Sequence, residues 1–254
     1  MLQTQDLTVR FGGHVAVNAV SCAFAPGTLT AIVGPNGAGK TTYFNLISGQ
    51  IKASAGRVSL DGRDLTALAA PERTRAGLGR AFQLTNLFPQ LSVLENVRLA
   101  VQARAGAGLD LWRIWSDRRD LLQKAEAVLE AVALADKRHE KAASLPHGDQ
   151  RKLEVGILMA LEPQVFMFDE PTAGMSVDEV PVILNLIRQL KADKTKTILL
   201  VEHKMDVVRE LSDRIIVLHN GELVADGEPE AVIASPVVQQ AYLGVSPSPQ
   251  EAAA

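Results

Sequence analysis

The sequence predicts an α/β fold in which a mostly parallel sheet is covered by helices on both faces. Largely apolar runs of strand length alternate along the chain with segments of helical periodicity, a pattern typical of parallel sheets. The clearest of these runs are Leu29–Val33, 165–168 and Thr197–Val201. With 254 residues, the chain is long enough for one large α/β domain, or for a domain that carries an inserted lobe.

The N-terminal part is predicted to be an antiparallel β portion. Residues 2–9 and 15–24 have the composition of strands, and a glycine-containing turn at 11–13 joins them. A further strand at 57–60 ends in a turn at 61–62. Strands joined by a turn this short can pair only antiparallel, which distinguishes this part from the rest of the chain.

Residues 93–162 are predicted to form a helical lobe inserted into the α/β core. Apolar residues recur there at helical spacing, and β-branched runs are absent. The recurring positions are Leu121, Leu122, Ala125, Val128, Leu129 and Val132. The glycines at 106–108 are predicted to interrupt the lobe as a loop, and a further helix from 148 to 161 ends before Pro163.

After the lobe, the alternation of strands and helices resumes. Ser176 and Glu179 have the spacing of a capping box, which predicts that a helix starts there. One face of this helix is apolar. Its members are Val180, Ile183, Ile187 and Leu190. Further on, Asn220-Gly221 between two short apolar runs predicts a β-hairpin.

These elements predict one domain over residues 1–245. Its α/β core comprises 1–92 and 163–245, and its helical lobe is 93–162. The remaining residues, 246–254, consist largely of serine, proline and alanine, and they are expected to form a flexible tail.

Composition narrows the classes of function. A net charge of −3 and a pI near 6.0 predict no basic patch, so no nucleic-acid partner is expected. The uncharged stretch between Arg10 and Lys40 is interrupted at 26–27 and 34–37, and a spanning helix needs about 20 apolar residues in a row. The single cysteine, Cys22, is expected to be a small buried side chain. We therefore expect a cytoplasmic protein.

The strongest chemical signal follows the strand Leu29–Val33 directly and reads GPNGAGKTT. Glycines let the backbone fold around phosphate groups, and the helix that begins near Lys40 adds the positive end of its dipole. Lys40 is expected to reach the β- and γ-phosphates and Thr41 to ligate Mg²⁺. The nucleotide-binding residues of this loop are Gly34, Pro35, Asn36, Gly37, Ala38, Gly39, Lys40, Thr41 and Thr42. The sequence therefore predicts a P-loop ATPase core that binds ATP and Mg²⁺.

Two acidic residues, Asp169 and Glu170, follow the apolar run at 165–168. A strand of this kind can direct the first carboxylate toward a metal ion. The second then lies at the end of the strand, where a carboxylate can orient or deprotonate an attacking water molecule. Downstream of a P-loop, this pattern favours Asp169 as a metal ligand and Glu170 as a catalytic residue.

With these motifs in order, the sequence resembles the ABC-transporter ATPase family over about residues 2–243. The resemblance implies that Phe11 stacks on adenine and that Gln83 contacts the metal and the attacking water. It also implies that 173–176 is the D-loop and that His203 contacts the γ-phosphate. The catalytic set implied in this way is Lys40, Gln83, Glu170 and His203, and the metal set is Thr41, Gln83 and Asp169.

The family signature, LSGGQ, is replaced here by LPHGDQ at 145–150. In the family, this segment contacts the ATP held by a partner subunit. Pro146 stands where the family has a serine, and proline offers neither a hydroxyl nor an N–H. Gly148 and the helix start still offer backbone donors. The residues of this segment expected to contact the nucleotide are Leu145, Gly148 and Gln150.

Within the family, the sequence is most similar to importers of branched-chain amino acids, on segments 80–83, 91–97, 201–208 and 241–244. The resemblance implies separate transmembrane permease subunits and, indirectly, a periplasmic binding protein. It also implies a second ATPase subunit, identical or related, that forms an ATP-sandwich dimer with this chain. The chain would then lie on the inner face of the cell membrane.

Other functions remain open on the sequence alone. Importers of urea, short amides or aromatic acids share these features, and the ATPase of a lipid or lipopolysaccharide exporter would have a similar sequence. ABC ATPases that act on DNA or ribosomes usually have two cassettes or a long coiled-coil insert, which this chain lacks. A small-molecule P-loop kinase is disfavoured by Gln83, His203 and 145–150. The transported substrate binds other subunits, so this sequence does not specify it.

Overall fold

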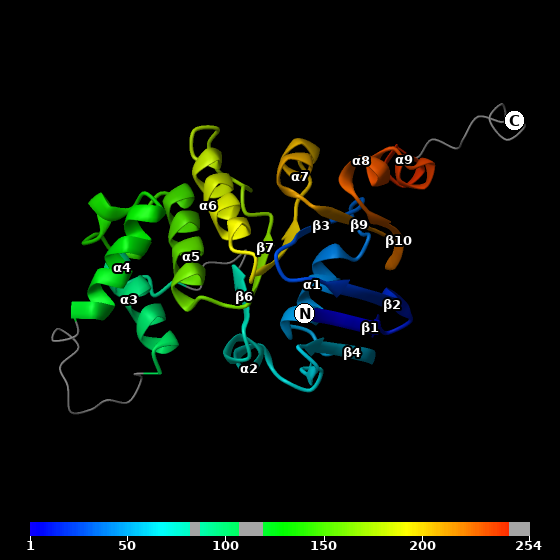
Figure 1. Cartoon of the computed structure of the whole chain (residues 1–254), viewed down its shortest axis with the longest axis horizontal. Helices are drawn as coiled ribbons and strands as arrows, with labels where there is room; N and C mark the ends of the chain where they lie inside the picture. Colours follow the sequence, from blue (N-terminus) through cyan, green and yellow to red (C-terminus); the bar gives the residue numbers. More distant parts are fainter. Residues whose placement is uncertain (82–86, 107–118, 244–254) are drawn as a thin grey trace, which may run out of the picture.

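The computed structural model describes residues 1–81, 87–106 and 119–243, which form a parallel and an antiparallel sheet with surrounding helices (Figure 1). The parallel sheet has the strand order β10-β9-β3-β8-β7-β6, in which β10 pairs antiparallel with β9. Its strands are β3 (Leu29–Val33), β6 (Leu78–Ala81), β7 (Val165–Asp169), β8 (Thr197–Val201), β9 (Arg214–His219) and β10 (Glu222–Gly227). The other described pairs are parallel, as predicted.

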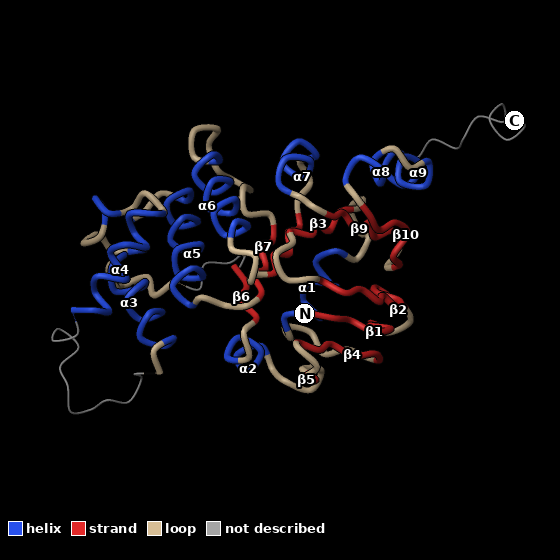
Figure 2. Tube along the Cα trace, in the orientation of Figure 1, coloured by secondary structure: helices blue, strands red, loops and turns tan. Residues whose placement is uncertain are grey.

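The antiparallel sheet lies beside the parallel one and has the strand order β2-β1-β4-β5 (Figure 2). Its strands are β1 (Leu2–Phe11), β2 (His14–Phe24), β4 (Ala55–Leu60) and β5 (Arg63–Asp64). Gly12 and Gly13 form the turn between β1 and β2. The predicted N-terminal antiparallel portion is therefore present.

Residues of the central strands alternate between two hydrophobic clusters, because successive side chains of a strand point to opposite faces. In β8, Ile198 and Leu200 pack in one cluster, whereas Leu199 and Val201 pack in the other. Both faces of the parallel sheet are therefore buried, which explains why its central strands are apolar along their length.

Helix α1 (Lys40–Ser48) packs between the two sheets. Its Tyr43 and Phe44 are completely buried and share a cluster with Leu2 of β1 and Met167 of β7. Burial of aromatic side chains contributes about 1.5–3 kcal/mol each to folding. The helix that follows the P-loop is thus fixed from two sides.

The opposite face of the parallel sheet is covered by α5 and α6, and α3 and α4 pack against α5 (Figure 1). The remaining helices are α2 (Ala70–Arg75), α3 (Val93–Arg104), α4 (Arg119–Ala131), α5 (His147–Leu161), α6 (Val180–Ala192), α7 (Met205–Leu211), α8 (Pro229–Ile233) and α9 (Pro236–Leu243). Two short 3₁₀ turns, η2 (Ala135–Lys137) and η3 (Ala142–Ser144), connect α4 to α5. Helices α3, α4 and α5 lie in the segment 93–162, whose assignment as a separate lobe stays a prediction.

Two local predictions have different outcomes. Asn220 and Gly221 form the turn between β9 and β10 with φ of 50° and 80°, so the predicted hairpin is present. The helix expected to start at Ser176 starts instead at Val180. The Glu179 carboxylate accepts hydrogen bonds from the Ser176 N–H (3.1 Å) and from the Ser176 hydroxyl (2.9 Å). One half of the predicted capping box is therefore present, but it closes a turn that precedes the helix.

Cys22 is buried in the cluster between the two sheets, with 7% of its surface exposed, as expected from the sequence. Among the described residues, no helix is both long and apolar enough to cross a membrane. The tail predicted at 246–254 lies outside the described residues.

Candidate active site

The loop at 34–39 connects β3 to α1 and has little room for side chains. Gly34 has a φ of 150°, and a Cβ atom there would lie 2.1 Å from the carbonyl oxygen of Leu218. Gly39 has a φ of 95°, and a Cβ atom there would lie 2.6 Å from the carbonyl oxygen of Ala16. Both positions therefore require glycine, and they hold the loop against β9 and β2.

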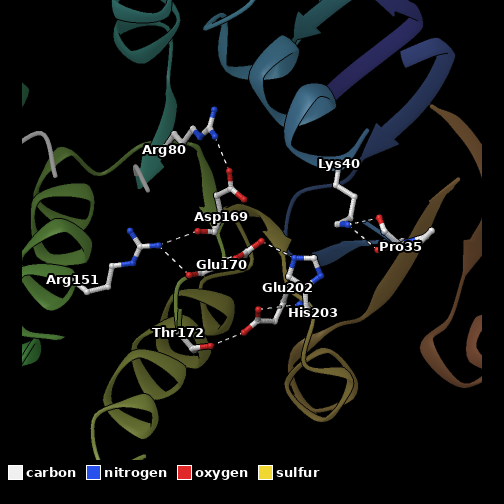
Figure 3. A network of polar contacts seen from close by, with 10 residues as sticks. Pro35, Lys40, Arg80, Arg151, Asp169, Glu170, Thr172, Glu202 and His203 are labelled. Atoms are coloured by element: carbon white, nitrogen blue, oxygen red, sulfur yellow. Dashed lines mark hydrogen bonds and ion pairs between the residues drawn. The ribbon is translucent and has the colours of Figure 1, made fainter. Parts of the chain in front are cut away.

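Lys40 is the first residue of α1, and its side chain folds back over the loop (Figure 3). Its Nζ donates to the carbonyl oxygens of Gly34 (2.7 Å) and Pro35 (2.8 Å). Burial lowers the pKa of the Lys40 ammonium, and the carboxylates of Glu170 and Asp169 act in the opposite direction. The arrangement places an ammonium group among backbone donors at a helix N-terminus, which is suited to binding phosphate.

A cavity of about 340 Å³ lies over this loop and joins segments that are far apart in the sequence. Its lining residues are His14, Ala16, Asn36, Gly37, Ala38, Gly39, Lys40, Thr41, Thr42, Glu170 and His203. The structure thus brings together the P-loop, the residue after β7 and the residue two positions after β8. His14 of β2 was not predicted as a site residue.

Glu170 follows β7 in the left-handed region, with a φ of 48°. Its backbone N–H donates to the carbonyl oxygen of Val201 at 2.9 Å, and its Oε1 lies 2.6 Å from Nε2 of His203. A non-glycine residue at positive φ is uncommon, and such strain is concentrated at functional sites. The Glu170 carboxylate therefore accepts a hydrogen bond from the His203 imidazole at the edge of the cavity.

Asp169, the last residue of β7, is buried and forms an ion pair with Arg80 of β6, in which Nη2 lies 2.7 Å from Oδ2 (Figure 3). Burial raises the pKa of the Asp169 carboxyl, and the Arg80 guanidinium lowers it. Within the described part of the chain, Oδ1 of Asp169 has no hydrogen-bond partner. A buried oxygen without a partner is costly, so this atom is available to a cation.

The donor set near Asp169 fits Mg²⁺, which is held through one or two carboxylates together with phosphate oxygens. Asp169 Oδ1 supplies a carboxylate oxygen, and Thr41 supplies a hydroxyl in the cavity. In the described ranges, no group of three or more histidine, cysteine or acidic residues could hold a metal by itself. Such an ion would therefore depend on the nucleotide for its other ligands.

Several polar residues that hold the site were not identified from the sequence (Figure 3). The carboxylate of Glu202, which is 3% exposed, accepts hydrogen bonds from the Thr172 hydroxyl (2.6 Å) and the His203 N–H (3.0 Å). Arg151 of α5 donates to the carbonyl oxygens of Asp169 and Glu170. In the sequence, Glu202 and Arg151 are distinguished only as charged residues next to His203 and next to the signature segment.

The signature segment at 145–150 contributes no residue to the lining of this cavity, as far as the described residues define it. Leu145 is buried, and its carbonyl oxygen accepts a hydrogen bond from the Gln150 side chain at 3.0 Å. Pro146 is exposed at the N-cap of α5. A Cβ atom at Gly148 would lie 2.1 Å from Oε1 of Glu179, so a carboxylate already covers this glycine.

The remaining predicted site residues are Phe11 and Gln83. Phe11 ends β1 and is 51% exposed, three residues before His14 at the cavity. An exposed aromatic ring there is available for stacking on a base. Gln83 lies outside the described residues.

The chain is similar to known proteins over most of its length. A family model described as "ABC transporter" matches residues 17–173. The chain is 38% identical to the high-affinity branched-chain amino acid transport ATP-binding protein LivG of Escherichia coli strain K12, over 96% of this chain and 98% of that protein. It is 35% identical to the corresponding protein BraF of Pseudomonas aeruginosa, over the same shares.

Solved structures show the same fold. An ATP-binding cassette of an ABC transporter in its ADP conformation has a TM-score of 0.81 and 30% identity, over 96% of this chain and 99% of that one. A dimeric ATP-binding cassette in a post-hydrolysis state, bound to ADP and Pi, has a TM-score of 0.77 and 26% identity. That match covers 90% of this chain and 99% of the other.

Proposed function

Because this chain belongs to the ABC transporter family of ATP-binding proteins, we propose that it is the ATP-hydrolysing subunit of an importer for branched-chain amino acids. One observation carries the proposal. The similarity to branched-chain amino acid transport ATP-binding proteins extends over nearly the whole length of both chains. Urea, amide or aromatic-acid import, and lipid export, have no comparable support among these relatives.

The residues of the cavity have distinct roles in this proposal. The Lys40 ammonium exchanges the carbonyl oxygens of Gly34 and Pro35 for phosphate oxygens when ATP binds. Asp169 and Thr41 hold Mg²⁺, which when bound neutralises charge on the phosphates. Glu170 accepts a proton from the attacking water or orients it.

His203 and Phe11 complete the binding of ATP at opposite ends of the nucleotide. His203 lies beside Glu170, with its backbone fixed by Glu202, and contacts the γ-phosphate. Phe11 stacks on the adenine ring, for which its exposed position is suitable. Gln83 completes the set as the contact to the metal and to water.

We also propose that this chain works in a complex with a second ATPase subunit and with membrane subunits. A second ATPase subunit, identical or related, forms an ATP-sandwich dimer with it, which is supported by the dimeric cassette that shares its fold. The signature residues Leu145, Gly148 and Gln150 then contact the ATP of that partner, once the Glu179 carboxylate that covers Gly148 is displaced. Closure of this dimer moves separate transmembrane permease subunits, to which a periplasmic binding protein delivers the substrate. The chain itself lies on the cytoplasmic face of the membrane.

The isolated chain is expected to have little or no ATPase activity and to gain it in the assembled transporter, because a complete site needs a signature segment from another subunit. The test measures ATPase rate per chain against protein concentration, for the chain alone and for the chain assembled with permease and partner ATPase subunits. A high rate that does not depend on concentration would contradict this prediction.

Transport itself is tested in proteoliposomes that contain the assembled complex and its binding protein. Uptake of leucine, isoleucine or valine should require ATP, and these substrates should stimulate hydrolysis. Urea, an aromatic acid and a lipid substrate serve as the alternatives. Uptake of one of them in place of leucine would retain the ATPase assignment and contradict the substrate class.

A further inference from the structure

Arg151 of α5 binds the backbone at the end of β7, directly behind the candidate catalytic carboxylate (Figure 3). Its Nη2 donates to the carbonyl oxygens of Asp169 and Glu170, each at 3.0 Å. The arginine is 6% exposed. A buried guanidinium that donates to two successive carbonyl groups fixes the path of the chain between them.

The position of the Glu170 side chain depends on this path. Residue 170 has a φ of 48°, so its backbone is in a conformation that surrounding contacts must maintain. Val201 accepts the hydrogen bond from its N–H at 2.9 Å, and Arg151 donates to its carbonyl oxygen. Both ends of the residue are thereby fixed, and its carboxylate lies 2.6 Å from His203.

Arg151 is itself held on its own helix. Its Nη1 forms a buried ion pair with Glu154, at i+3 on α5, at 2.9 Å. A buried charge of this kind persists only when it is paired and hydrogen bonded. The guanidinium is therefore a rigid extension of α5, with Nη1 on Glu154 and Nη2 on the carbonyl groups at 169 and 170.

We propose that Arg151 is a positioning residue for Glu170. It transmits the position of α5 to the backbone that aims the catalytic carboxylate. The N-terminal end of α5 carries the signature segment, so contact with the partner's nucleotide at that end reaches this chain's own hydrolytic site through Arg151. The inference rests on the proposed role of Glu170 in hydrolysis.

The experiment compares Arg151→Lys with Arg98→Lys, each with and without Glu170→Gln, in the assembled transporter. Arg98 is a matched control, because it is buried to the same degree (7% side-chain exposure) and pairs with Glu95 at i−3 (2.7 Å). Lysine keeps the positive charge, but one ammonium nitrogen cannot occupy both positions of the arginine fork. The readouts are single-turnover hydrolysis of labelled ATP, the dissociation constant of a fluorescent ATP analogue, and the thermal midpoint.

Arg151→Lys is expected to lower the hydrolysis rate about tenfold or more, because small displacements of a reacting group are costly. Nucleotide affinity should stay within about twofold, since the variant removes no phosphate contact. In the Glu170→Gln background, Arg151→Lys should cause no further loss, because residues that act as a unit are not additive. Arg98→Lys should leave the rate within about twofold in both backgrounds.

Three results would overturn the inference. An unchanged rate in Arg151→Lys would show that the contact does not matter for hydrolysis. An equal loss with and without Glu170→Gln would show that Arg151 does not act through Glu170, and an Arg151→Lys chain that does not fold would assign the arginine to stability. Turnover that survives in Glu170→Gln alone would contradict the proposed role of Glu170 as well, which separates the two failures.

Discussion

Replacing Glu170 with glutamine is expected to lower ATP turnover by about 10²–10⁴-fold and to leave ATP binding intact. Glutamine keeps the size of the side chain but cannot accept a proton from water. The carboxylate lines the cavity over the P-loop, and its Oε1 lies 2.6 Å from His203, so it is placed for this role. The loop residues that hold the phosphates are unchanged in the variant, so affinity should remain.

The measurement is steady-state ATPase activity of the assembled transporter, together with nucleotide affinity by fluorescence titration. Glu162→Gln provides a matched control, because Glu162 has a similar φ (46°) but caps α5 away from the cavity. The control should keep its activity within about twofold, as surface substitutions usually do. Near-normal turnover in Glu170→Gln would assign the catalytic role to another group.

Replacing Pro146 with serine is expected to strengthen ATP-driven dimerisation by about ten- to a hundredfold. A hydrogen bond to a charged group contributes about 1.5–3 kcal/mol when it is well made, and 1.4 kcal/mol is a factor of ten in an equilibrium constant. Pro146 is exposed at the N-cap of α5, so a serine there could present its hydroxyl to the partner's phosphate. Proline at this position offers no donor.

Capping of α5 competes with the predicted increase in dimerisation, because residue 146 is the N-cap of that helix. Serine is a preferred N-cap residue, and its hydroxyl oxygen can instead accept a hydrogen bond from the first turn of α5, stabilising the helix by about 0.5–2 kcal/mol. These two uses of the hydroxyl can be told apart by experiment. Capping alone would raise the thermal midpoint of the monomer, whereas phosphate contact would raise the ATP-dependent association.

Association is measured by sedimentation in the Glu170→Gln background, with ATP and with ADP, and Pro146→Ala serves as the control that removes proline without adding a hydroxyl. We expect serine to exceed alanine with ATP only. Association of Pro146→Ser that equals or falls below that of the chain with Pro146 would show that the backbone near Gly148 already supplies the binding. Equal association of the serine and alanine variants would show that the hydroxyl contributes nothing.

Local patterns in the sequence predicted the parts of the fold that depend on neighbouring residues. The bounds of β3 and β8 agree with those expected, because a largely apolar run is buried on both faces. Asn220-Gly221 could be identified because its turn needs positive φ at both positions. Strand β6 was not predicted, because its four residues include Gly79 and Arg80 and have no apolar pattern.

The unpredicted part of the site consists of contacts between distant segments. Arg80 and Asp169 are separated by 89 positions, and they meet only because β6 and β7 are neighbours in the sheet. Arg151 donates to the carbonyl oxygens at 169 and 170. Because every residue has a backbone carbonyl group, the sequence does not indicate which ones accept such a bond. Motifs therefore identified residues that the structure brings to one cavity, whereas the residues that hold them required the three-dimensional arrangement.

The burial of Cys22 makes this chain a convenient subject for site-specific spectroscopy. It is the only cysteine in the sequence, 7% of its surface is exposed, and burial raises the pKa of its thiol. Because the thiolate is the reactive form, a maleimide or spin-label reagent should leave it unmodified. A cysteine introduced at Val177, which is 87% exposed in the turn that precedes α6, could then carry a single probe. If two copies of this chain form the proposed dimer, the distance between two such probes would follow its closure without any prior removal of native thiols.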